Sequence, residues 1–253
     1  MIGVVVVSHS PALAHAAVDL ALQMVPGEKP AIAIAAGAGE GLIGTDATAV
    51  SAAIDEVASP EGVLVIMDLG SAVMSAEMAL DFRSSEAEVR LSSAPFVEGI
   101  LAAVVTAAGG GSLDDVDREA RGALEPKISM LGGAPAPEIA TPDVAAPDGT
   151  ASAASVAERA PAGLSADLTI INSDGLHARP AATLVSTLAG FDAKLTVVNT
   201  RSGTGPVAAN SLIGLLSLGA KSGDVLTVAA SGAQAAEALA KVTELVTEGF
   251  GEV

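Results

Sequence analysis

Four short segments in the first half of the chain have the apolar character of strands. They are residues 2–7, 31–35, 63–67 and 89–92. The first is an unbroken apolar run rich in valine, which is typical of a strand buried on both faces of a parallel sheet. Each segment leads into a turn and then into a longer stretch, as a repeated strand–helix unit requires.

The longer stretches carry apolar residues three and four positions apart, the spacing of one helix face. The predicted apolar stripes are Leu13, Ala17, Leu20 and Met24; Val50, Ile54 and Val57; and Met74, Met78 and Phe82. Residues 97–108 and 114–124 predict two further helices. Strands that alternate with helices predict an α/β domain over residues 1–125, with a doubly wound parallel sheet covered on both faces.

Residues 126–163 show no periodic pattern of apolar residues. Their prolines stand among alanine, glycine, serine and threonine. Such a composition cannot bury a core and predicts a flexible, partly extended linker. Residues 151–160 are alternatively a short helix. A flexible tether of this length spans on the order of 30–35 Å.

Residues 164–253 return to regular periodicity, and here apolar and polar residues alternate within the strands. We predict strands over residues 167–172, 194–199, 206–209 and 225–229, and helices over residues 181–189, 212–218 and 233–247. Alternation is typical of strands with one face buried and the other in solvent. We therefore expect a sheet with helices on one face only.

The chain of 253 residues has no cysteine, which excludes disulfides and thiolate catalysis. Its mean hydropathy of +0.55 comes largely from alanine and short valine runs. No apolar run approaches the roughly 20 residues that span a bilayer, and residues 1–4 lack the basic region of a signal peptide. These features predict a soluble cytoplasmic protein.

The formal net charge is −18, and most of it lies in the first half. Residues 1–125 hold 18 acidic and 5 basic residues, residues 126–163 hold 4 and 2, and residues 164–253 hold 8 and 5. A nucleic-acid partner needs a basic face, so this class of partner is excluded. With four phenylalanines and no tryptophan or tyrosine, stacking platforms for bases are nearly excluded as well.

A histidine, His177, lies where a predicted strand turns into a predicted helix, just ahead of Pro180. Proline is favoured in the first turn of a helix, and the unpaired amides of that turn attract phosphate. Arg179 adds a cationic fork beside them. A neutral imidazole can hold a phosphoryl group reversibly, so we predict a phospho-accepting histidine. The alternative is a surface histidine in a loop.

A second set of polar residues follows the predicted strands of the first half. His9, Gly37, Asp68 and Ser71 all lie near strand carboxyl ends, where ligands of parallel sheets bind. They are therefore expected to converge on one crevice, although His9 alone is equally explained as a polar residue at a sheet end. Ser71 and Thr45 are also good helix N-caps.

Residues 175–181 (GLHARPA), between a strand and a helix, resemble the active-site loop of HPr, the histidine phosphocarrier of the bacterial phosphoenolpyruvate:sugar phosphotransferase system. The resemblance implies an HPr-like α+β open-faced sandwich over residues 164–253, phosphorylated on His177. Ser211 matches the position that some bacteria phosphorylate in HPr. Asn210 departs from the lysine often found before it, and Ser211 is also a good N-cap, so we predict no regulation there.

Residues 1–125 resemble the IIA-type domain of the DhaM family of phosphotransferase-dependent dihydroxyacetone kinases, which has the mannose-type IIA fold. The resembling stretches are residues 5–10, 32–37, 43–46, 67–72 and 94–99. The resemblance implies that His9 is phosphorylated and that Asp68 orients its ring. It also implies that Thr45, Gly70 and Ser71 line the same site.

Together the two resemblances imply a phosphotransferase that relays phosphate between histidines. Enzyme I would phosphorylate His177, which would pass phosphate to His9 and then to ADP on the DhaL subunit, for dihydroxyacetone on DhaK. We expect a homodimer through residues 1–125 and no metal or cofactor on this chain. Some relatives continue into a domain like enzyme I; this chain stops earlier, so a separate enzyme I is expected.

Other assignments use the same residues differently. A regulatory phosphoprotein would carry both histidines and report phosphotransferase status to a binding partner. A Rossmann-like nucleotide-binding protein is disfavoured because the glycine pattern at residues 37–39 is incomplete. His15 has no metal-binding partner at a suitable spacing and is expected to be solvent-facing or packed on its helix.

Overall fold

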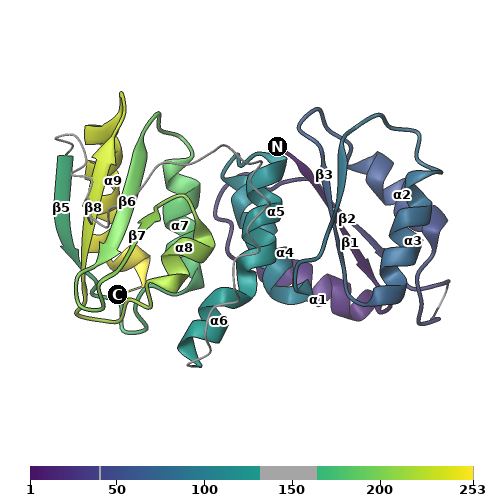
Figure 1. The fold of residues 1–253 in the computed structure, drawn as a ribbon, viewed down its shortest axis with the longest axis horizontal. Helices are drawn as coiled ribbons and strands as arrows, with labels where there is room; N and C mark the ends of the chain where they lie inside the picture. The colour runs from purple at the N-terminus through teal and green to yellow at the C-terminus, as the bar shows by residue number, and fades with distance from the viewer. Residues whose placement is uncertain (40, 132–163, 253) are drawn as a thin grey trace, which may run out of the picture.

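The computed structural model describes residues 1–39, 41–131 and 164–252. These residues form two four-stranded sheets, one in each half of the chain. In Figure 1 the first half lies on the right and the second half on the left, with helices of both halves between the two sheets.

The first sheet is parallel, with strand order β2-β1-β3-β4. Its strands are β1 (Gly3–Ser8), β2 (Ile32–Ala36), β3 (Val63–Met67) and β4 (Val89–Ser92). The helices are α1 (Pro11–Leu22), α2 (Ala47–Glu56), α3 (Gly70–Leu80), α4 (Phe96–Ala108) and α5 (Leu113–Arg121). One core packs α2 and α3 on one face, and another packs α1, α4 and α5 on the opposite face. The predicted doubly wound sheet is confirmed.

One predicted apolar stripe is wrong about which face of the helix is buried, and another is right only in part. Met74, Met78 and Phe82 are 69%, 54% and 56% exposed, and α3 packs instead through Ala72, Ala76 and Ala79. Leu13 and Leu20 of α1 are likewise exposed, while Ala14, Ala17, Val18 and Ala21 are buried. Small side chains let a helix approach the sheet closely, which leaves the large ones outside. Among the described helices, none is long and apolar enough to cross a membrane.

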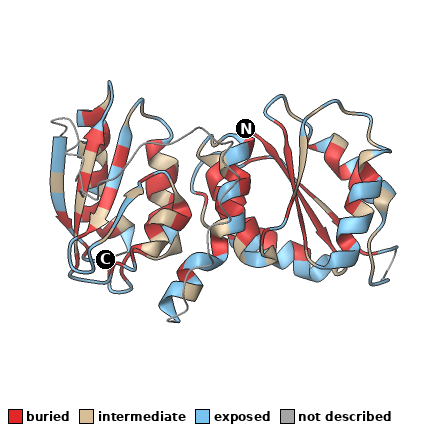
Figure 2. Ribbon diagram, in the orientation of Figure 1, coloured by how far each residue is buried: buried red, intermediate tan, exposed pale blue. Residues whose placement is uncertain are grey.

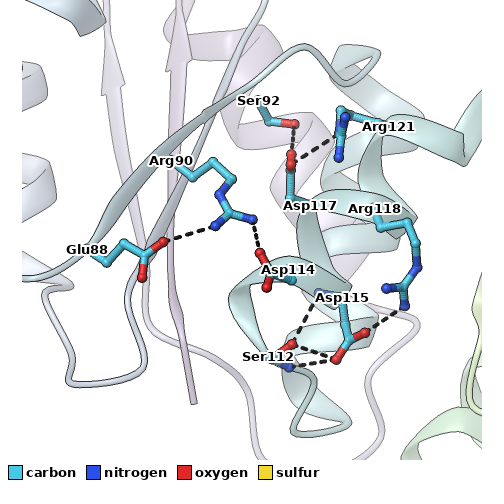
Figure 3. Close-up of polar contacts among 9 residues, drawn as sticks. All are labelled: Glu88, Arg90, Ser92, Ser112, Asp114, Asp115, Asp117, Arg118 and Arg121. Carbon is cyan, nitrogen blue, oxygen red and sulfur yellow. Dashed lines mark hydrogen bonds and ion pairs between the residues drawn. The ribbon is translucent and has the colours of Figure 1, made fainter. Parts of the chain in front are cut away.

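A polar network fixes α5 against β4 (Figure 3). Ser92 Oγ donates to Asp117 Oδ1 at 2.7 Å, and Arg90 pairs with Asp114 and with Glu88. Ser112 and Asp115 form a capping box at the start of the helix, which satisfies two otherwise unpaired amides. The orientation of α5 is therefore set from both its sheet-facing side and its first turn.

The helical part of the first half extends further than predicted. The chain continues from α5 through the 3-10 helix η1 (Gly122–Leu124) into α6 (Glu125–Met130). Pro126 lies in the first turn of α6, where a missing amide hydrogen costs nothing. Residues 126–130 of the predicted linker are thus helical. Residues 132–163 of the linker, with the alternative helix at residues 151–160, lie outside the described residues.

The second sheet is antiparallel, with strand order β5-β8-β6-β7. Its strands are β5 (Leu164–Thr169), β6 (Lys194–Asn199), β7 (Thr204–Ala208) and β8 (Val225–Ser231). The helices are α7 (Ala178–Leu188), α8 (Leu212–Ser217) and α9 (Ala235–Thr247), followed by the 3-10 helix η2 (Gly249–Gly251). Alternate residues of β6 and β8 are buried under the helices (Figure 2). The predicted open-faced sandwich is confirmed.

The element before the HPr-like motif differs in position from the prediction. β5 ends at Thr169, and α7 begins at Ala178, three residues before the predicted start. Asn172 lies outside the strand, and its side chain donates to the carbonyl of Gly249 at 2.8 Å. The loop between β5 and α7 is therefore longer than predicted, and His177 is the residue that ends it.

Candidate functional site

The first candidate site forms where neighbouring parallel strands end. His9 follows β1, Gly37 follows β2 and Asp68 follows β3. Because β1 lies between β2 and β3 in the sheet, the three residues share one edge of it. This edge includes the point where the strand order reverses, between β1 and β3, where open α/β sheets bind their ligands. The predicted convergence is confirmed for these residues.

Asp68 is the centre of the hydrogen bonds at this edge. Its Oδ2 accepts from the His9 backbone N–H at 2.8 Å and from Ser8 Oγ at 2.9 Å. Its Oδ1 lies 2.9 Å from His9 Nδ1 and accepts from the Leu69 N–H at 2.7 Å. The Asp68 side chain is only 7% exposed. The carboxylate therefore fixes both the backbone and the ring of His9.

The charge state of Asp68 determines which nitrogen of His9 carries the proton. Burial is the largest influence on this carboxyl and raises its pKa, but the hydrogen bonds from His9 and Ser8, together with the nearby ring, lower the pKa below its ordinary value. An ionised carboxylate can only accept, so Nδ1 of His9 donates to it. Nε2 then carries the lone pair and accepts from Ser71 Oγ at 2.8 Å.

The other predicted site residues, Thr45, Gly70 and Ser71, play different structural parts around His9 and Asp68. Thr45 Oγ1 lies 2.7 Å from Ser75 Oγ and so joins its loop to α3. Asp46, not Thr45, caps α2. Leu69 precedes α3 without a side-chain cap, so Ser71 does not act as an N-cap either. The amides of Gly70 and Ser71, in this first turn, lack intrahelical partners.

Gly37 has a backbone reason to be glycine. Its φ is +86°, and a Cβ there would lie 3.2 Å from the carbonyl oxygen of Leu42 and 3.3 Å from Pro11. Its N–H donates to the Ser8 carbonyl at 3.1 Å. Gly37 therefore shapes the backbone of the loop beside His9.

The second candidate site is built around the start of α7. His177 is the N-cap residue of this helix but makes no side-chain cap, and its side chain is 38% exposed. Gly175 brings the loop close to its neighbour, because a Cβ there would lie 2.3 Å from the carbonyl oxygen of Ala220. The Leu176 N–H donates to the same oxygen at 2.9 Å. The loop is held by its backbone, so the imidazole is not needed to hold it in place.

The group that orients the ring of His177 is not apparent from the sequence around it. Its Nε2 lies 3.0 Å from Glu252 Oε2, near the end of the chain. Asn172 Nδ2 donates to the same oxygen at 3.0 Å. If the carboxylate is ionised, Nε2–H donates to it and Nδ1 carries the lone pair. No local signal could have found Glu252, because it lies 75 residues away along the chain.

Arg179 and the first turn of α7 supply positive charge near His177. Arg179 is exposed, and its guanidinium makes no ion pair with the residues that the structure describes. Pro180 in the same turn has no amide hydrogen, so Ala178 and Arg179 carry the available N–H groups. A phosphoryl group on Nδ1 would find these donors within one helical turn.

The two histidines share one design and differ in which nitrogen is free. In each ring, one nitrogen is hydrogen-bonded to a carboxylate. Each ring also lies at the first turn of a helix that has no side-chain N-cap, which is α3 for His9 and α7 for His177. The geometry leaves Nε2 available on His9 and Nδ1 on His177. His15 takes no part, since its Nδ1–H donates to the Pro11 carbonyl at 2.7 Å on the exposed side of α1.

Both halves of the chain match known protein families. Residues 3–117 match a family model described as PTS system fructose IIA component. Residues 164–248 match one described as PTS HPr component phosphorylation site. The first range includes His9 and Asp68, and the second includes His177 and Arg179.

Relatives and solved structures extend these matches. The phosphoryl donor subunit DhaM of PEP-dependent dihydroxyacetone kinase from Pantoea ananatis is 43% identical over 75% of this chain, which spans 38% of that protein. A crystal structure of HPr from Thermoanaerobacter tengcongensis is 34% identical, covering 36% of this chain and 98% of the other, with a TM-score of 0.33. The DhaM subunit of dihydroxyacetone kinase 2 from Listeria innocua is 34% identical over 42% of this chain and 85% of its own length. The chain therefore belongs to the family of DhaM phosphoryl donor subunits.

Proposed function

We propose that the chain is a phosphohistidine carrier that receives phosphate on His177 and passes it on from His9. One observation carries this proposal. Both motif histidines are oriented by a carboxylate on one ring nitrogen, and the other nitrogen is left at an uncapped helix start. A structural histidine does not need such an arrangement, whereas a nucleophile does.

At His177 the lone pair of Nδ1 attacks the phosphorus of the donor. A bond from nitrogen to phosphorus forms while the bond from phosphorus to the donor's leaving group breaks, and the departing pair stays with the donor. The ring becomes positively charged, and Glu252 stabilises that charge through the proton on Nε2. The backbone N–H groups in the first turn of α7 and the guanidinium of Arg179 donate hydrogen bonds to the negative phosphoryl oxygens.

At His9 the same step occurs, but the attacking nitrogen is Nε2 and not Nδ1. Nε2 attacks the phosphorus carried by His177, whose own bond to phosphorus breaks and returns the electron pair to that ring. Asp68 holds the proton of Nδ1 and stabilises the positive ring. The Ser71 hydroxyl, which donates to Nε2 before the reaction, can then donate to a phosphoryl oxygen. Positioning and charge stabilisation are the main contributions that such transfers need from the protein.

The names of the relatives support the partners that we propose. Relatives bear the name of phosphoryl donor subunit of a PEP-dependent dihydroxyacetone kinase. For this chain we propose that enzyme I is the donor to His177. We propose that the acceptor from His9 is ADP held on DhaL, which serves dihydroxyacetone on DhaK. We also propose that the chain is cytoplasmic, forms a homodimer through residues 1–125 and has no cofactor of its own. In this proposal the chain is a phosphate carrier, and its partners perform the kinase chemistry.

The experiment that tests the proposed function follows phosphate through the whole system. The purified chain is incubated with enzyme I, labelled phosphoenolpyruvate and the DhaL subunit loaded with ADP, and labelled ATP is measured. Formation of ATP that requires this chain supports the carrier function. If the chain becomes labelled but no label reaches ADP, the chain is a regulatory phosphoprotein and the carrier proposal fails.

Replacing Glu252 by glutamine should slow phosphorylation of His177 by about three- to tenfold. Glutamine keeps an acceptor for Nε2–H but removes the charge that stabilises the phosphorylated ring. The effect is modest because both side chains are partly exposed, at 38% and 21%, so solvent screens the interaction to about 1 kcal/mol. The measurement is the initial rate of labelling by enzyme I.

Glu248→Gln is the matched control, since it removes one charge from the same end of the chain at an exposed position. It should leave the labelling rate unchanged. A second readout is the histidine tautomer by nitrogen-15 NMR, because Glu252→Gln should lower the fraction of neutral His177 with its proton on Nε2. Equal rates and equal tautomer fractions in the two variants would show that Glu252 does not orient the ring.

A further inference from the structure

The two halves of the chain are joined by a specific polar contact. Glu119, on α5, accepts hydrogen bonds from Ser211 Oγ at 2.8 and 2.9 Å. It also accepts from the backbone N–H of Ile213, on α8, at 3.0 Å. Glu119 is only 7% exposed and Ile213 8% exposed. A carboxylate is rarely buried without such partners, so the contact specifies how the halves meet.

Apolar packing surrounds this contact. α4 contacts both α7 and α8, and α6 contacts α8. Val185 of α7 packs so closely on Gly109 that a Cβ at position 109 would lie 3.1 Å from Val185 Cγ1. Buried residues on the facing helices belong to one continuous core, seen as facing red segments in Figure 2. The second half therefore docks with its α7–α8 face against α4, α5 and α6.

The helix that carries Glu119 is held rigidly from its other side. Figure 3 shows Asp117 of α5 bound by Ser92 of the sheet and by Arg121. Glu119 lies two residues further along the same helix and reaches the other half. The acceptor is thus placed before docking, which lowers the entropic cost of making the contact.

The interface also contains a crevice. Next to Glu119 there is a crevice of about 90 Å³, whose lining includes Asp115 and Arg118 from one half and Asn210 from the other. Interfaces between domains that carry buried polar contacts and crevices resemble transient protein interfaces more than permanent cores.

The docked arrangement keeps the two histidines apart. In Figure 1 β1, which leads to His9, ends on the right, while the chain terminus, next to the Glu252 that contacts His177, lies on the left. Nε2 of His9 contacts Ser71 of α3, and α3 covers the sheet face opposite to α4 and α5. Transfer between the rings requires them to bind one phosphorus atom at the same time, and the docked halves do not allow this within a chain.

We propose that the contact of Glu119 with Ser211 and Ile213 is a clasp that holds the carrier in a closed state, which must open before phosphate passes from His177 to His9 of the same chain. The closed state itself is a property of the fold. Its effect on transfer rests on the proposed function.

A disulfide across the interface tests the closed state. The chain has no native cysteine, so Gly109→Cys/Val185→Cys introduces a single pair, at two positions whose side chains would be in contact across the interface. The control is Gly109→Cys/Thr169→Cys. Thr169 is exposed at the end of β5. β5 is an edge strand of the second sheet, and β8 separates it from β6. Under a mild oxidant the first pair should close at least tenfold faster than the control. Equal rates would overturn the closed state, whether or not the chain carries phosphate.

The clasp and the effect on transfer are tested in the same background. Adding Glu119→Gln should slow closure of the 109–185 disulfide several-fold, whereas Glu125→Gln, an exposed glutamate nearby, should not. At a dilution where transfer between separate chains is negligible, and with enzyme I and phosphoenolpyruvate, the oxidised chain should place no label on its own His9, and reduction should restore it. Equal labelling of His9 in the oxidised and reduced chains would overturn the gating, and a reduced chain that never labels would instead refute the proposed function.

Discussion

Replacing His177 by alanine should reduce labelling of the whole chain by enzyme I to background, at His9 as well as at position 177. The relay makes His177 the entry point for phosphate, so His9 has no donor without it. The substitution should not disturb the fold, because His177 does not cap α7 with its side chain and is 38% exposed. The measurement is label retained after separation from enzyme I, with the unfolding temperature as a check.

The matched variant is His9→Ala, which removes the second histidine and leaves the first. It should label through His177 to about half the stoichiometry of the natural chain but pass nothing on to an acceptor. If the chain with His177→Ala still labels His9 at the natural rate, the second half is not the obligatory donor and the relay order is wrong.

Replacing Asp68 by asparagine should slow phosphate transfer through His9 by about 10²- to 10³-fold. Asparagine offers one oxygen where Asp68 accepts from four donors, which are the His9 ring and backbone, Ser8 and Leu69. The ring then loses both its fixed tautomer and the charge that stabilises its phosphorylated form. A rate loss of this size corresponds to about 3–4 kcal/mol of transition-state stabilisation. The measurement is single-turnover transfer to the acceptor.

The control for this variant is Asp46→Asn. Asp46 caps α2 through its side chain, and asparagine caps equally well, so transfer should be unaffected. A rate for Asp68→Asn within threefold of the natural chain would show that the carboxylate does not orient the nucleophile.

The same carboxylate should contribute to stability in a defined pH range. The pKa of Asp68 is lowered in the folded chain from an ordinary value of 3.8. The stabilisation is therefore fully present above pH 3.8 and is lost as the pH falls through the lowered value. The difference in unfolding temperature between the natural chain and Asp68→Asn should be constant near neutral pH and should narrow in acid.

Several strand positions and both histidine motifs were predictable because they depend on local sequence. Residues 63–67 and 194–199 form strands with the predicted bounds, since continuous apolar and alternating runs have few other structures. His9 and Asp68 were predictable as neighbours because the carboxyl ends of adjacent parallel strands meet at one edge. These inferences need only chain order and sheet topology.

Features that depend on tertiary packing were not predictable. Periodicity identified the helices α1 and α3 but assigned large side chains to the core, whereas alanines pack there. Glu252 reaches His177 only because the chain end folds back past Asn172. In the sequence, Glu119 is one of several acidic residues in a charged helix. Ser211, which it contacts, is 92 residues away along the chain. No spacing rule connects residues this far apart.

The most direct test of the relay uses two chains that each keep one histidine. The chain with His9→Ala is labelled on His177 by enzyme I, purified from it and mixed with the chain carrying His177→Ala. Our account predicts that label disappears from the first chain and appears on His9 of the second, in the absence of any other phosphate source. Label that remains on His177, while the same preparation still returns it to enzyme I, would contradict the account.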